Sequence, residues 1–120
     1  NALKIIDNGY ITLDLGQSWY EFTGLPFVYA LWVVKRDRHI PGINNLLKSA
    51  KEAGLRSLKA LAITESQRLQ LTHERCLNYL TNSIRYDFGK NEIQGFLAFY
   101  QHAVSLGLAP KGVEIVFNET

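Results

Sequence analysis

The sequence predicts an α/β protein in which one buried strand is followed by a series of amphipathic helices. Residues 27–34, FVYALWVV, are all apolar or aromatic, with Pro26 just before them and Lys35 just after. An unbroken apolar run of strand length, bounded in this way, is typical of a strand covered on both faces. Several later stretches repeat apolar residues with a helical period. Because ligands gather at the loops that feed such strands, we expect a binding site near the bend at residues 23–26.

The composition is that of a globular domain or a piece of a larger one. Among 120 residues, 47% are hydrophobic and 20% are charged, which excludes a disordered chain. A net charge of +2 is too small to indicate a nucleic-acid-binding protein. The basic cluster of Lys35, Arg36 and Arg38 is interrupted by Asp37. We interpret it as a solvated loop, with an anion contact as the alternative.

The few cysteines and histidines argue against metal, disulfide and nucleophile chemistry. Cys76 is the single cysteine, so we expect no intrachain disulfide and no cysteine zinc site, but a buried, inert thiol on a helix face. His39, His73 and His102 are too scattered for a metal site, and no nucleotide-binding or nucleophile motif is present. No apolar run is long enough to span a membrane and no signal peptide is visible, so we expect a cytoplasmic protein. Because the chain begins at Asn1, upstream processing or truncation stays open.

The first part of the chain reads as strand, helix and bend. Residues 10–15 alternate polar and apolar side chains, which predicts a half-buried strand that Gly16 ends. Residues 17–22 suit one or two helical turns with Trp19 on the apolar face. Pro26 then favours an extended conformation for the residue before it and begins the long strand.

The middle of the chain predicts three helices in succession. Pro41 is suited to the first turn of the first helix, and Gly54 to its end. Residues 57–69 continue with the same period, and Thr72 is expected to cap the helix that carries Cys76. The apolar positions of the first helix follow the i, i+3, i+4, i+7 spacing: Ile43, Leu46, Leu47 and Ala50.

The last part predicts one strong amphipathic helix between two extended pieces. Residues 83–88 read as a short strand or an extended link. Asn91 and Gln94 have the spacing of a variant capping box, and Gly107 is expected to close the helix. Residues 112–117 are predicted as a short strand. A strand that is apolar on both faces needs several neighbours, and these elements supply too few.

One stretch resembles a known family. The residues Asp14-Leu15-Gly16, Trp19, Thr23-Gly24-Leu25-Pro26-Phe27-Val28, Ala30 and Trp32 resemble the chorismate dehydratases of menaquinone biosynthesis by the futalosine pathway. The likeness continues more weakly through Ile84-Arg85-Tyr86-Asp87 and Gly95-Phe96. It implies a type II periplasmic-binding-protein-like fold with two lobes, of which this chain resembles the C-terminal portion.

The resemblance also implies a division of the chain and a partner for it. Residues 1–26 would complete the second lobe and carry the ligand-facing turns. Residues 27–120 would form the hinge strand and the helices that return to the first lobe. The N-terminal remainder of the same protein would supply most of both sheets.

The function implied by the resemblance is the dehydration of chorismate, a small dicarboxylate, to 3-[(1-carboxyvinyl)oxy]benzoate. Aromatisation drives this elimination, so no metal or organic cofactor is expected. The expected substrate-binding residues are Trp19, Thr23, Gly24, Leu25 and Phe27. Free backbone N–H groups at the turns would suit a carboxylate, and aromatic side chains would wall a flat ring.

Alternatives stay open at each level. The aromatic residues also suit a core, and Thr23-Gly24 also suits a helix stop. The catalytic groups are unknown, since Asp14 fits a turn cap and Glu21 a surface charge. Rival functions are the related 1,4-dihydroxy-6-naphthoate synthase, a non-catalytic small-anion-binding module of periplasmic-binding-protein type, and a merely structural domain.

Overall fold

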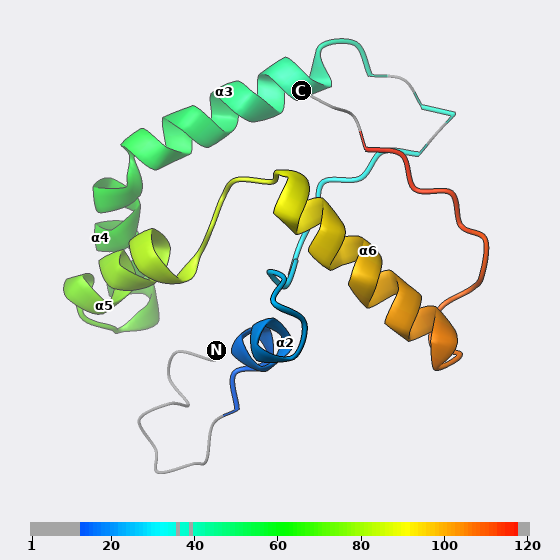
Figure 1. The fold of residues 1–120 in the computed structure, drawn as a ribbon. Helices are drawn as coiled ribbons and strands as arrows, with labels where there is room; N and C mark the ends of the chain where they lie inside the picture. The colour runs from blue at the N-terminus through cyan, green and yellow to red at the C-terminus, as the bar shows by residue number, and fades with distance from the viewer. Residues whose placement is uncertain (1–12, 36, 39, 118–120) are drawn as a thin grey trace. The chain divides into compact units, whose positions relative to one another are not determined.

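The computed structural model describes residues 13–35, 37–38 and 40–117, which fall into two compact units (Figure 1). The first unit joins the described residues up to Trp32 with Phe88–Val116. The second unit comprises the described residues of Val33–Asp87 and also Phe117. Each unit is built from helices, and we describe each by itself.

The first helix of the first unit, α2, spans Leu15–Thr23. Its N-cap is Asp14, whose carboxylate accepts the Gln17 N–H at 3.0 Å. The helical turns predicted at 17–22 are therefore confirmed, and the helix is longer than predicted. The strand predicted at 10–15 is wrong over the part that is described, because a capping carboxylate fixes the start of a helix there. Residues 10–12 lie outside the described residues.

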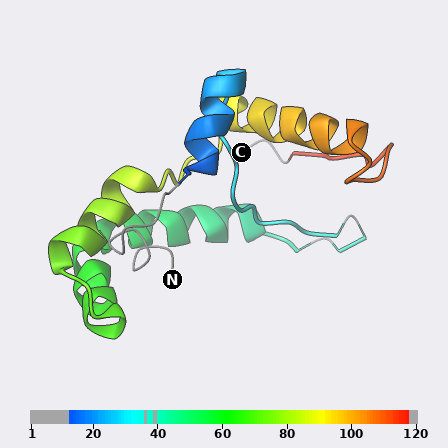
Figure 2. The ribbon, with the colours of Figure 1, turned by 90° about the horizontal axis from the view of Figure 1, so that it is seen from below.

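The second helix of this unit, α6, spans Lys90–Ser105 and lies beside α2 (Figure 2). Its N-cap is Gly89, whose N–H donates to the Glu92 carboxylate at 2.9 Å. The predicted capping by Asn91 and Gln94 is wrong by two residues. Asn91 lies within the first turn, and the acidic residue satisfies the free N–H group just before the helix.

The end of α6 is a Schellman motif. Gly107 has a φ of +72° and donates its N–H to the Val104 carbonyl at 3.0 Å. The next N–H, that of Leu108, donates to the Ala103 carbonyl at 2.8 Å. These two bonds satisfy carbonyls that the helix leaves free. The predicted closure of the helix at Gly107 is confirmed.

The second unit contains the three predicted helices and one further element. In chain order these are α3 Ile43–Arg56, α4 Leu58–Leu69, α5 His73–Asn78 and the π-helix η1 Tyr79–Ser83. Pro41 precedes the helix instead of entering it, because Gly42 is the N-cap of α3. The helix end predicted at Gly54 is also wrong. Gly54 lies inside α3 without a positive φ, and Ser57 separates α3 from α4.

The buried centre of the second unit lies between α4 and α5. Ala62 is fully buried, and Ser66, one turn further along α4, is 8% exposed. Cys76 on α5 is 3% exposed, so the predicted burial of the thiol is confirmed. The predicted cap is confirmed as well, since the Arg75 N–H donates to the Thr72 hydroxyl at 3.3 Å. Small residues allow the two helices to approach closely here.

The link after α5 starts as a π-helix, which the sequence did not predict. η1 includes Ser83, the first residue of the predicted link. Ile84 is extended, and residues 85–88 form neither a helix nor a strand, as expected of a link. The Thr81 hydroxyl donates to the Leu77 carbonyl at 2.8 Å, and the Tyr86 hydroxyl donates to the Leu80 carbonyl at 3.1 Å. These two hydroxyl groups donate hydrogen bonds to backbone carbonyls where the α-helix changes to a π-helix.

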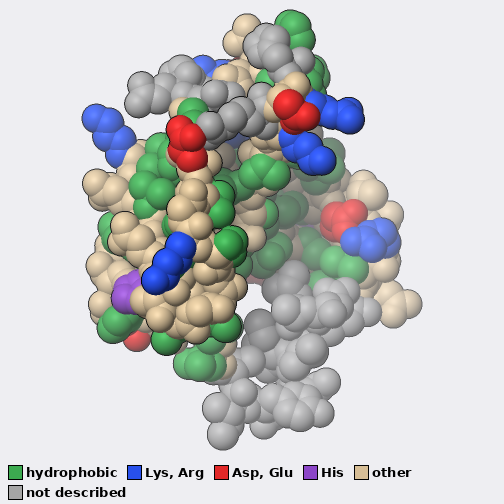
Figure 3. Space-filling model, turned by 90° about the vertical axis from the view of Figure 1, so that its right-hand side faces the viewer, with side chains coloured by type: hydrophobic (Ala, Val, Ile, Leu, Met, Phe, Trp, Pro, Cys, Tyr) green, Lys and Arg blue, Asp and Glu red, His purple; other side chains and the backbone are tan. Residues whose placement is uncertain are grey.

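Residues 27–34 form neither a helix nor a strand, so they do not form the predicted buried strand. Trp32 is 84% exposed and Val33 is 83% exposed. The residues that the structure describes contain no strand, so this segment has no ladder partner among them. A strand needs neighbouring strands for its hydrogen bonds and its burial. The strand predicted at 112–117 is wrong as well, because no described residue offers it a neighbouring strand. Of the α/β prediction, the described residues therefore confirm the helices alone. Figure 3 shows hydrophobic side chains exposed at the surface.

Candidate functional site

The bend predicted to bind a ligand follows α2 directly and is closed by its own side chain. The Thr23 hydroxyl donates to the Trp19 carbonyl at 2.8 Å and accepts the Leu25 N–H at 3.1 Å. Gly24 has a φ of +70°, and its N–H donates to the Tyr20 carbonyl at 2.7 Å. This left-handed residue ends α2 and turns the chain towards Pro26. The local sequence Thr-Gly-Leu-Pro thus fixes the shape of the bend.

Helix α6 packs directly against this bend through backbone atoms. Gly95 is buried within α6, next to the carbonyl group of Pro26. A Cβ built on Gly95 would fall under 3.0 Å from the Pro26 carbonyl oxygen. Such a close approach of two backbones is a position that only glycine fills without displacement.

Aromatic side chains from α2, the bend and α6 pack together around Trp19. The Trp19 and Phe99 ring centroids lie 5.5 Å apart with the planes at 75°, and the Trp19 and Phe27 centroids lie 6.2 Å apart at 71°. Phe27 also meets Phe99 edge-on, with the centroids 5.1 Å apart. Edge-to-face contacts of this kind are favourable for aromatic quadrupoles. The members of this aromatic cluster are Trp19, Phe22, Phe27, Tyr29, Phe99 and His102.

One polar atom in the aromatic cluster has no hydrogen-bond partner among the described residues. The indole Nε1 of Trp19 is buried, and no acceptor within the described part of the chain lies in reach. His102 presents its ring to the indole instead, with the centroids 5.8 Å apart and the planes at 88°. A buried N–H without an acceptor is uncommon in proteins and destabilises the fold unless a water or another group reaches it.

The five predicted substrate-binding residues all lie in the first unit, within or next to α2. Trp19 and Phe27 are half-buried in the aromatic cluster, and the Thr23 hydroxyl is used within the bend. Leu25 is half-buried, and Gly24 faces open space, with no atom within 4 Å of a Cβ built there. The contacts present suit a core and a helix stop. Contact with a ligand stays a prediction for all five residues.

No acid–base pair gathers around the bend within the described part of the chain. Asp14 caps α2, and Glu21 is exposed and accepts a hydrogen bond from the Gln17 amide at 2.9 Å. Both carboxylates therefore have the cap and surface roles expected of them. The pKa of Asp87, in the second unit, is lowered by a hydrogen bond from Lys51 at 2.8 Å. Among the described residues, no three potential metal ligands lie close enough together to hold a metal ion.

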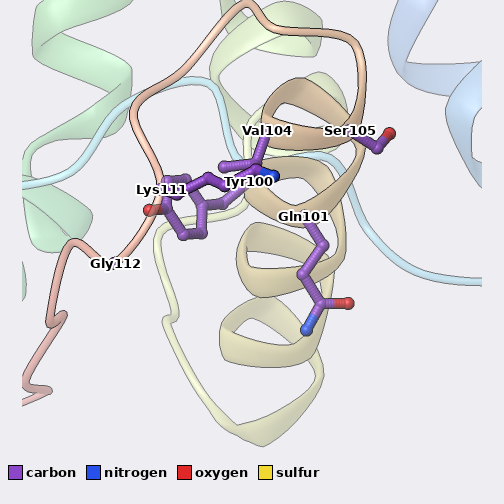
Figure 4. A pocket seen from close by; sticks show the side chains of 6 residues that line it. All are labelled: Tyr100, Gln101, Val104, Ser105, Lys111 and Gly112. Atoms are coloured by element: carbon purple, nitrogen blue, oxygen red, sulfur yellow. The ribbon is translucent and has the colours of Figure 1, made fainter.

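A surface hollow of about 350 Å³ lies at the end of α6, away from the bend (Figure 4). The hydroxyl of Tyr100, beside this hollow, binds two backbone groups of the segment that follows α6. It donates to the Pro110 carbonyl at 2.7 Å and accepts the Val113 N–H at 3.2 Å. The lining residues are Tyr100, Gln101, Val104, Ser105, Lys111 and Gly112. None of the five predicted substrate-binding residues lines this hollow. Tyr100 holds the chain after α6 against the helix.

A second hollow, of about 340 Å³, lies in the second unit at the start of α3. Exposed Arg38 and the first residues of α3 contribute to its lining. Lys35 and Asp37 are exposed too, which confirms the predicted solvated loop for the described part of the basic cluster. Arg36 lies outside the described residues.

The sequence reasoning missed the residues that α6 contributes to this site. Gly95, Phe99 and His102 follow one another at i, i+4 and i+7, so they share one face of the helix. This helical spacing is the sequence signal that could have placed the three residues on one contact surface. From the sequence this helix was predicted only as amphipathic, and none of the three residues was expected at the site.

Comparison with known families agrees with the resemblance carried by α2 and the bend. A family model described as menaquinone biosynthesis matches residues 4–105. The chain belongs to the menaquinone biosynthesis family. The match includes α2, the bend and the whole of α6, so every member of the aromatic cluster lies within it.

One protein with a similar sequence is named for an enzymatic activity. The chain is 33% identical over 98 residues to the chorismate dehydratase of Thermus thermophilus. The aligned part is 81% of this chain but 35% of the relative, so the chain spans about a third of that protein's length. No solved structure matches the chain. None of the described helices has the length and apolar character needed to cross a membrane.

Proposed function

We propose that this chain is part of a chorismate dehydratase of menaquinone biosynthesis, in the futalosine pathway. The enzyme would remove one water from chorismate and release 3-[(1-carboxyvinyl)oxy]benzoate in the cytoplasm. The observation that carries the proposal is the identity of 33% with a protein named chorismate dehydratase, within a family described as menaquinone biosynthesis.

The fold that accompanies this function is the two-lobed α/β fold of type II periplasmic binding proteins. In it, residues 1–26 end the second lobe, and residues 27–120 form the hinge strand and the helices that return to the first lobe. The exposed side chains of Tyr29, Trp32 and Val33 support this assignment, because neighbouring strands would cover them. The N-terminal remainder of the same protein is the partner that supplies those strands.

The substrate-facing part of this chain is the bend with the aromatic cluster beside it. Gly24 leaves the backbone open to an approaching ligand. Trp19 and Phe27 hold the bend in place and offer ring faces to a flat, unsaturated ring. Thr23 and Leu25 complete the contact surface. The N–H groups of Gly24 and Leu25 are bonded within the bend, so other neutral or cationic donors would bind the two carboxylates.

The chemistry divides between this chain and the residues beyond it. The elimination breaks a ring C–H bond and the C–O bond of the hydroxyl, forms the aromatic ring and releases water. A base must take the ring proton and a donor must protonate the leaving hydroxyl. Asp14 and Glu21 have other partners, so we place the base and the donor in the N-terminal remainder. The residues of this chain shape the pocket and orient the substrate.

The proposal is tested by incubating the full-length protein that contains these residues with chorismate and following the product by mass spectrometry. Loss of one water, absent from a reaction without enzyme, is the expected result. Bound chorismate without conversion would instead favour a small-anion-binding module. Conversion of the later pathway intermediate alone would favour the 1,4-dihydroxy-6-naphthoate synthase. A protein that neither binds nor converts either compound would contradict all three functions.

A further inference from the structure

Helix α6 carries a glycine at the point where it passes the bend. Gly95 is buried in the helix interior, where glycine is less favourable than alanine by about 1 kcal/mol. Its φ is not positive, so backbone conformation does not require glycine. What requires it is space, since a Cβ there would fall under 3.0 Å from the Pro26 carbonyl oxygen.

The obstruction is made of backbone atoms, which cannot rotate away as a side chain can. The same Cβ would lie 3.3 Å from the carbonyl carbon of Pro26 and 3.6 Å from its nitrogen. One turn further along α6, Phe99 packs on Phe27, the residue that follows the bend. Gly95 and Phe99 together therefore fix how closely the bend can lie to the helix.

We propose that Gly95 is a positioning residue for substrate binding. By leaving its Cβ position empty, it lets the Pro26 carbonyl lie against α6 and so sets where residues 23–27 face the substrate. A methyl group at residue 95 would push that carbonyl, and the bend with it, away from the helix. The inference rests on the proposed function, because it takes the bend as the substrate-facing surface.

The test compares Gly95→Ala with Gly54→Ala in the full-length protein. Both positions lie within helices, Gly54 in the last turn of α3, but no atom lies within 4 Å of a Cβ built on Gly54. Gly95→Ala should raise the KM for chorismate about tenfold or more and change kcat by less than about threefold, because the ground-state contacts are displaced. Gly54→Ala should leave both within about twofold. An unchanged KM in Gly95→Ala, or a loss confined to kcat, would overturn the proposal.

A second pair of variants keeps the test decisive if Gly95→Ala does not fold. Pro26→Gly frees the backbone at the bend and allows the carbonyl to move. In that background Gly95→Ala should fold and raise the KM by no more than about threefold, because the two sites are coupled. An unfolded double variant would contradict the proposal. So would a KM in the double variant that is tenfold or more above the KM of Pro26→Gly alone.

The failure of this inference can be separated from the failure of the proposed function. If the wild-type protein neither binds nor converts chorismate, the proposed function is wrong. The positioning claim is then tested by the amide NMR signals of Leu25 and Phe27 in the wild-type and Gly95→Ala proteins. Displacement of both signals is expected, with little change in Gly54→Ala. Signals that coincide in all three proteins would refute the claim.

Discussion

The indole ring of Trp19 stands edge-on to the ring of Phe99, with the two centroids 5.5 Å apart. This contact joins α2 to α6, two helices that are distant in the sequence. Phe27 touches both rings and carries the chain out of the bend. The position of the bend therefore depends on aromatic packing as well as on the local turn.

Replacing Phe99 with alanine should destabilise the protein. The side chain is 46% exposed, so the loss should be smaller than for a fully buried ring, about 1–3 kcal/mol. Urea unfolding of the full-length protein measures it. Tyr20→Ala is the matched control, because Tyr20 is 55% exposed and lies outside the aromatic cluster, and it should cost about 0.5 kcal/mol or less. Equal effects of the two substitutions would show that the cluster does not hold α2 and α6 together.

The hydroxyl of Thr23 should contribute more to stability and to the KM for chorismate than its methyl group does. Thr23→Val removes both the donor to the Trp19 carbonyl and the acceptor for the Leu25 N–H. An unpaired N–H in the half-buried bend should cost about 1–2 kcal/mol, and the KM for chorismate should rise. Thr23→Ser keeps the hydroxyl and should stay close to the wild type in both. The prediction fails if valine and serine behave alike in unfolding and in KM.

The two glycines near helix ends should respond to alanine in opposite directions. Gly107 has a φ of +72° in the Schellman motif, so Gly107→Ala should destabilise by about 1 kcal/mol. Gly54 lies inside α3 with open space around it, so Gly54→Ala should stabilise by about 0.5–1 kcal/mol. Thermal unfolding of both variants checks the signs. A stabilising Gly107→Ala would contradict the end of α6 as described.

Tyr86 should ionise late when the pH is raised. Burial raises the pKa of Tyr86 above its ordinary value, and the charge of Tyr79 acts in the same direction. A pKa that is higher in the folded than in the unfolded state stabilises the fold below the unfolded value of about 10. This stabilisation is lost as the pH rises through the folded value. Tyrosinate absorbance against pH, in the wild type and in Tyr86→Phe, tests it. The component that the variant loses should ionise above the ordinary tyrosine pKa, and a lost component at the ordinary pKa would contradict the prediction.

The parts of the fold that local chemistry decides were predictable from the sequence. The apolar period of residues 57–69, the Thr72 cap and the closure at Gly107 all depend on neighbours within a turn. Asp14 was expected as a cap for the same reason. The start of α6 was misplaced because two candidate caps lie close together, and a side chain of Glu92 decided between them.

The parts that depend on distant residues could not be predicted in the same way. Residues 27–34 carry the pattern of a buried strand, but burial needs neighbours, and no described residue forms one. For the candidate site, the bend and the ring of Trp19 were predicted. Their contact with Gly95 and Phe99 was not, because helical spacing indicates which residues share a face but not what that face will meet.

The most direct test of the central claim is whether chorismate reaches the bend. Full-length protein with selectively labelled leucine and phenylalanine is titrated with chorismate while the amide signals of Leu25 and Phe27 are followed. Both signals should shift and reach half of their full displacement at the concentration that half-saturates turnover, while leucine signals from α4 stay in place. Turnover of chorismate with no change at Leu25 and Phe27 would show that the substrate binds elsewhere.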